Sequence, residues 1–108
     1  MLFRSWTILT DYLGGTSVAG GFMKQTGTNN WTSPNTSATN TSSFTGHPGG
    51  FRSDGGTFST VSYLGYWWSA SENFATYAWY RYLHYFYANA NRLYDNKSMG
   101  LSVRCVRD

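Results

Sequence analysis

Residues 78–86 read AWYRYLHYF, and this unbroken run of large side chains decides how the 108-residue chain folds. Successive side chains of a β-strand point to opposite faces of the sheet. The run therefore predicts a strand whose odd-numbered side chains, from Trp79 to Tyr85, are buried, while its even-numbered side chains meet water. The even-numbered set is Tyr80, Tyr82, His84 and Phe86.

The two ends of the chain predict one helix and one further strand. Large apolar side chains recur from Leu2 to Leu13 at spacings of four, three and four residues, which places them on one face of a short helix. The dipeptide Gly14-Gly15 follows as a stop signal. Near the other end, alternating apolar residues from Leu101 to Cys105 are typical of a half-buried strand.

The middle of the chain, residues 16–60, is dominated by Gly, Ser, Thr and Asn and has no helical period. A linker would not carry such regularly spaced large apolar residues, so we expect ordered loops and short strands held to the core by aromatic anchors. The dipeptide Asp54-Gly55 has the chemistry of a turn. One helix, a loop-rich middle and antiparallel strands predict an α+β fold in a single domain, residues 1–108. The expected anchors are Phe22, Met23, Trp31, Phe44, Phe51 and Phe58.

Composition excludes several classes of protein. A chain with 19% aromatic and 12% charged residues is not disordered, and no apolar run approaches the roughly 20 residues that span a membrane. The basic residues behind the net charge of +3 are scattered, unlike the clustered charge of a nucleic-acid binder. No His or Cys spacing predicts a metal or cofactor, and the single Cys105 cannot form an internal disulfide.

Aromatic residues gather in the C-terminal half, where residues 63–94 hold 13 of the 21 in the chain, mostly tyrosine. One face of an aromatic strand is normally core, but a domain of this size has too little material to cover both faces. Tyrosine offers a large contact area with little rotamer entropy to lose, and its hydroxyl adds a hydrogen bond. We therefore expect the even-numbered face to be an exposed recognition surface.

Five phrases of the sequence, taken in order, resemble one known family. They are TILTDYLGGTSVAGG (7–21), WTSPNTSATNTSSFTGHPGGFR (31–52), LGYWWSASE (64–72), AWYRYL (78–83) and GLSVRCVRD (100–108). The set resembles the Fibrobacter succinogenes major paralogous domain. This resemblance implies a C-type lectin-like fold, related to that of formylglycine-generating enzymes. It also implies further strands upstream, so we expect the chain to be the C-terminal portion of a larger module.

Some members of that family resemble the target proteins of diversity-generating retroelements, which rewrite adenines in a C-terminal stretch of codons in bacteria and their phages. Rewriting the adenines of an asparagine codon gives a restricted set of residues. We therefore expect a variable ligand-binding region over residues 72–99, in which every candidate position carries a residue of that set. The candidate ligand-binding residues are Asn73, Phe74, Thr76, Tyr77, Tyr80, Tyr82, His84, Phe86, Asn89, Asn91, Leu93, Tyr94, Asp95 and Asn96. The residues that resemble a fixed scaffold are Trp79, Arg81, Leu83, Tyr85, Arg92 and Lys97.

The resulting hypothesis is a ligand-binding or display domain of a surface or phage protein, whose Tyr-rich surface binds a macromolecular ligand. The expected partner is a protein or glycan on a cell surface, without nucleic acid, membrane insertion or cofactor, and with an oligomer left open. The expected location is the cell surface, the extracellular space or a virion, although the first residues contain no secretory signal.

Three other functions remain to be weighed against display. Single-stranded nucleic-acid binding also uses aromatic residues together with arginine, and its affinity would fall steeply with added salt. A metal-independent carbohydrate-binding module is the alternative, because the Glu-Pro-Asn and Trp-Asn-Asp motifs of calcium-dependent lectins are absent from the sequence. Enzyme activity is not expected, because the formylglycine-generating relatives resemble oxidases built around a cysteine pair and this chain has one cysteine.

Overall fold

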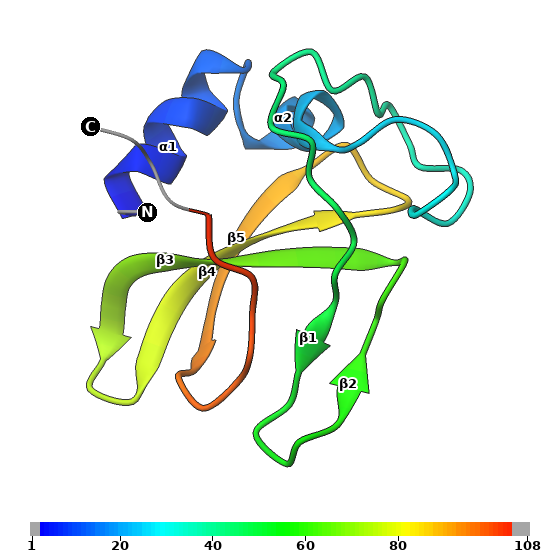
Figure 1. Ribbon diagram of the computed structural model, residues 1–108. Coiled ribbons are helices and arrows are strands. Elements are labelled where there is room, and N and C mark those ends of the chain that lie inside the picture. Colours follow the sequence, from blue (N-terminus) through cyan, green and yellow to red (C-terminus); the bar gives the residue numbers. More distant parts are fainter. Residues whose placement is uncertain (1–2, 105–108) are drawn as a thin grey trace.

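The computed structural model, which describes residues 3–104, has two helices on one side of a three-stranded antiparallel sheet, with a small two-stranded hairpin beside it (Figure 1). This arrangement confirms the predicted α+β class. The helices are α1 (Phe3–Tyr12) and α2 (Thr16–Met23), and the strands are β1 (Phe51–Arg52), β2 (Phe58–Ser59), β3 (Leu64–Phe74), β4 (Tyr77–His84) and β5 (Ala90–Asn96).

The strand order β3-β4-β5 makes β4 the centre of the sheet. β4 pairs with β3 from His84 opposite Leu64 to Tyr80 opposite Trp68, and with β5 from Tyr77 onward. Paired residues of neighbouring strands share a face of the sheet. We call the side packed against α1 and α2 the helix face and the opposite side the outer face. The odd-numbered side chains of β4 lie on the helix face and the even-numbered ones on the outer face.

The core lies between the helix face and the two helices. Trp6 of α1 contacts Phe44 and Trp67, with ring centroids 5.6 and 6.4 Å apart. Leu83 of β4 and Trp31 join this cluster and are each 1% exposed. The expected anchoring of the loop-rich middle is thus confirmed at Trp31 and Phe44, which carry the loops into the core.

The N-terminal helix is confirmed, but the second helix is not predicted by the sequence. α1 ends before Gly14 and Gly15, whose φ angles of 102° and 101° suit glycine. α2 follows at once, although its sequence TSVAGGFM has low helix propensity. Ala19 and Met23 of α2 are fully buried, so tertiary packing overrides the weak local preference.

The β1–β2 hairpin turns at Asp54-Gly55, as predicted, and the Ser53 N–H donates to the Thr57 carbonyl at 2.8 Å. Each strand has only two residues, so the hairpin does not bring its side chains back to the core. Phe58 is therefore 74% exposed, and the prediction that it anchors the loops is wrong.

The strand predicted from Leu101 to Cys105 is not formed over the described residues. Ser102 alone bridges β3, and its N–H donates to the Tyr66 carbonyl at 3.1 Å. Val103, expected to be buried, is 67% exposed because the chain has already left the sheet there. Cys105 lies outside the described residues.

Lys24, directly after α2, is fully buried and ties three separate segments together. Its ammonium donates to the backbone oxygens of Thr36, His84 and Tyr87 at 2.8, 2.9 and 3.2 Å, and lies 5.6 Å from the centroid of the Trp31 ring. Burial lowers the pKa of Lys24 to about 8. The group is therefore protonated at neutral pH and has one N–H for each of the three carbonyls.

Candidate ligand-binding surface

The centre of the outer face is more buried than the alternation of the sequence predicts. Tyr80 is only 5% exposed. Because it lies on the central strand, its ring is flanked by Tyr66 and Trp68 of β3 and by Tyr82, with centroids 5.5, 6.0 and 6.1 Å away. The prediction that Tyr80 meets water is therefore wrong. Of the other even-numbered residues, Tyr82 and His84 are half-buried and Phe86 is 52% exposed.

The phenol of Tyr80 should titrate well above the ordinary range of tyrosine. Burial raises the pKa of Tyr80 to about 12, and the nearby Asp95 carboxylate adds to the effect. The folded protein then holds a proton that the unfolded chain releases near pH 10, so this phenol stabilises the fold below about pH 10, and that stabilisation is lost as the pH rises toward 12. An NMR titration of the tyrosine ring carbons, with Tyr80→Phe to assign the signal, measures this midpoint. A midpoint near the ordinary value would show that the ring is solvated.

A second group of rings lies on the helix face, near the turn between β3 and β4. Phe74 contacts Tyr77, Tyr77 contacts Tyr94, and Tyr94 contacts Trp79, with centroids 6.2, 6.1 and 5.1 Å apart. We call these four residues the aromatic ladder. Phe74, Tyr77 and Tyr94 are 63%, 37% and 42% exposed, and Trp79 is half-buried. The core and the helices therefore leave this end of the face largely uncovered.

The pairing register of β4 and β5 places the rings of the ladder next to one another. Trp79 lies opposite Tyr94, and Arg81 lies opposite Arg92, so the two strands present aromatic and basic side chains at neighbouring positions. The guanidinium carbon of Arg92 lies 4.5 Å from the centroid of the Trp79 ring, a cation–π contact. From the sequence, Trp79 and Arg92 are expected to belong to the fixed scaffold. The sequence does carry one signal of this contact. An aromatic residue precedes a basic one by two positions at 79–81, and the order is reversed at 92–94, as expected for antiparallel partners.

A third group of rings lies at the opposite end of β4. Tyr85 contacts Tyr63 and stacks on His84, while Phe86 and Tyr87 contact each other, with centroids 5.1 to 5.4 Å apart. Burial and the nearby positive charge of the Lys24 ammonium lower the pKa of His84. Phe86 and Tyr87 are 52% and 53% exposed, which makes this the second exposed aromatic cluster of the sheet.

The candidate residues predicted from the sequence therefore divide among three places and do not form one patch. Those at the β3–β4 turn and the adjoining end of β5 are Asn73, Phe74, Thr76, Tyr77, Tyr94 and Asn96. Those on the outer face are Tyr80, Tyr82, Asn91, Leu93 and Asp95. Those at or beyond the far end of β4 are His84, Phe86 and Asn89.

The described residues offer binding chemistry of a limited kind. Within residues 3–104, no three His, Cys, Asp or Glu side chains gather where a metal ion could be held. Neither α1 nor α2, the helices of this same range, has the length and apolarity needed to cross a bilayer. The surface is instead rich in exposed tyrosine and phenylalanine, whose chemistry is contact area and hydrogen bonding.

Comparison with protein families gives a match over nearly the whole chain. The family model of the Fibrobacter succinogenes major domain matches residues 4–107, nearly the whole chain. Neither the curated proteins nor the solved structures give a match.

Proposed function

The chain belongs to the Fibrobacter succinogenes major domain family, and we propose that it is a ligand-display domain that binds a protein through the aromatic ladder. One observation carries the proposal, namely four large rings in continuous contact, three of them 37% to 63% exposed. A contiguous aromatic patch of this kind on a monomer is typical of an interaction site.

The composition of the ladder supports a protein as the ligand. Tyr, Trp and Arg are the residues that most often dominate the binding energy of protein interfaces. Tyr77, Tyr94, Trp79 and Arg92 bring all three types together on two neighbouring strands. The strands fix the backbone, so little conformational entropy is lost when a partner docks on the side chains.

The geometry of the rings is less suited to the alternative, a carbohydrate-binding module. Successive rings of the ladder are inclined at 71° to 75°, so they do not form a common plane on which a sugar chain could stack. Arg92 covers one face of the Trp79 indole. Binding of defined glycans by an array, with and without chelator, would favour the carbohydrate-binding module over the present proposal.

We extend the proposal to diversification of the ligand-binding surface. Phe74, Tyr77 and Tyr94 carry residues that adenine rewriting of an asparagine codon could produce, whereas Trp79 and Arg92 resemble the fixed scaffold. The expected genomic arrangement is a reverse transcriptase gene beside this gene, with a near-copy of its 3′ end that differs almost only at adenines. A gene neighbourhood without these features would remove the diversification and leave the binding surface.

A random peptide library selected on the wild-type domain tests the ladder directly. Peptides that bind should lose about 100-fold in affinity for the Tyr77→Ala/Tyr94→Ala variant, because interface tyrosines each contribute on the order of 1 to 2 kcal/mol. Both side chains are exposed, so the thermal unfolding midpoint should change little. Binding is measured by surface plasmon resonance.

The matched control is Tyr12→Ala, because Tyr12 of α1 is 86% exposed and lies outside the three aromatic groups. Wild-type affinity is expected for this variant. If Tyr12→Ala lowered the peptide affinity as much as Tyr77→Ala/Tyr94→Ala does, the peptides would bind any exposed tyrosine, and the proposal would fail.

A further inference from the structure

Arg81 is a buried charge whose partners are all neutral. Its side chain is on the helix face and the residue is only 3% exposed. Its Nη1 donates to the Ala90 carbonyl at 3.3 Å and its Nη2 to the Thr7 hydroxyl at 3.2 Å, while its Nε–H has no hydrogen-bond partner. No carboxylate in residues 3–104 lies within ion-pair distance of it. Buried charges are normally paired, so this guanidinium is short of one anionic partner.

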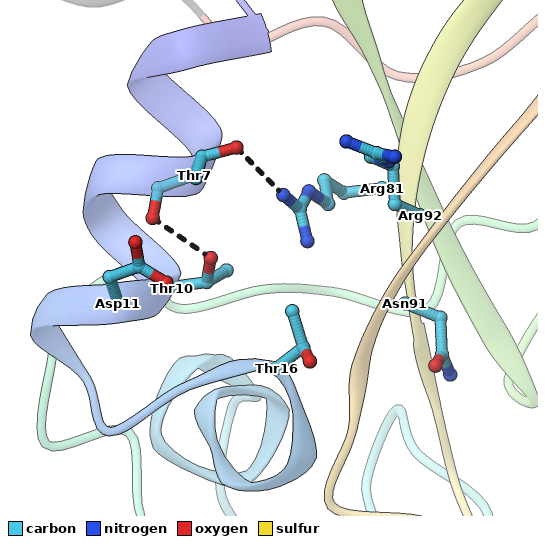
Figure 2. A pocket seen from close by; sticks show the side chains of 7 residues that line it. All are labelled: Thr7, Thr10, Asp11, Thr16, Arg81, Asn91 and Arg92. Atoms are coloured by element: carbon cyan, nitrogen blue, oxygen red, sulfur yellow. Dashed lines mark hydrogen bonds between the residues drawn. The ribbon is translucent and has the colours of Figure 1, made fainter.

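A pocket of about 340 Å³ opens beside this guanidinium, between α1, the start of α2 and β5. Figure 2 shows Arg81 reaching between Thr7 of α1 and Thr16 of α2, with Asp11 farther along α1 and Arg92 on the adjacent strand. The walls therefore combine hydroxyl and guanidinium groups. A volume of this size holds one small organic anion.

The charges around the pocket set the charge of the anion that fits. Arg81 and Arg92 lie directly opposite each other on β4 and β5, and like charges in that position repel. Burial and then Arg92 lower the pKa of Arg81, while Asp11 raises it. Two guanidiniums and one carboxylate therefore line the pocket. A ligand carboxylate carries one negative charge and meets less repulsion from Asp11 than a dianion would.

We propose that this pocket binds a monoanionic carboxylate, such as that of an acidic sugar or an acidic peptide side chain. The carboxylate is attracted by the guanidinium groups of Arg81 and Arg92, which both line the pocket. The pocket adjoins the surface proposed above for protein docking, and Arg92 contributes to both.

Sodium glucuronate and sodium acetate are the probes, with glucose as the neutral control and chloride to hold the ionic strength constant. The Nε–Hε signal of Arg81 in a ¹⁵N-resolved NMR spectrum should shift saturably with both carboxylates and not with glucose. Arg92→Gln should weaken binding about fivefold through the loss of one nearby charge. Asp11→Asn should tighten binding about threefold, because it removes the competing carboxylate.

Control variants separate the pocket from the rest of the surface. Arg52→Gln changes an exposed arginine of β1 and should leave glucuronate binding unchanged. Tyr77→Ala/Tyr94→Ala should also leave it unchanged, so failure of the ladder proposal and failure of the pocket proposal give different results. The proposal is overturned by shifts that do not saturate, by affinities that ignore Arg92→Gln and Asp11→Asn, or by inorganic phosphate binding more tightly than glucuronate.

Discussion

Lys24→Met is expected to lower the free energy of unfolding by about 3 to 5 kcal/mol. Methionine fills much of the space of the lysine stem but has no N–H, so the carbonyls of Thr36, His84 and Tyr87 lose their shared donor. Each buried carbonyl left without a partner costs on the order of 1 kcal/mol or more. The loss is measured by urea unfolding followed by tryptophan fluorescence.

Lys97→Met is the matched control for this experiment. Lys97 is a surface residue whose ammonium pairs with Glu72, and the same chemical change there should cost less than about 1 kcal/mol. Equal losses in the two variants would show that removal of any lysine has this effect and that the three carbonyls are satisfied in another way.

Gly20→Ala is expected to lower the free energy of unfolding by about 3 kcal/mol, even though alanine favours helices. A methyl group at Gly20 of α2 would lie 2.1 Å from the carbonyl oxygen of Asn89 and 2.8 Å from that of Ala88. Both contacts are with backbone, so neither can be relieved by a side-chain rotation. The helix would have to move away from the start of β5.

Gly55→Ala serves as the control, because a methyl group there meets only the Ser53 hydroxyl, at an ordinary contact distance of 3.8 Å. Its unfolding free energy should stay within about 0.5 kcal/mol of the wild-type value. If Gly20→Ala unfolded at the same urea concentration as Gly55→Ala, this result would contradict the close packing of α2 against the residues that precede β5.

The elements that the sequence predicts are those whose pattern is local. The apolar spacing and the Gly14-Gly15 stop identify α1, and the alternation of residues 78–86 identifies β4. α2 is missed because its two glycines look like loop chemistry, and only the close approach of Gly20 to Asn89 explains them. That approach joins residues far apart in the chain and leaves no local pattern.

Exposure on the sheet is likewise decided by neighbours in space. Alternation correctly separates Tyr80 from Arg81 as residues of opposite faces. It does not show that rings from two strands close over Tyr80, or that Tyr77 and Tyr94 stay exposed on the opposite face. The register between β4 and β5 is needed to see that Trp79, Tyr94 and Arg92 form one surface.

Lys24 holds main-chain oxygens and no side-chain atom of the segments it joins. Any residue with a normal backbone supplies the same oxygen, so the identities of the residues at 36, 84 and 87 are free of this constraint. Substitutions at the far end of β4 can therefore leave these hydrogen bonds, and the packing that they hold together, intact. One buried lysine therefore leaves the side chains at these positions open to change.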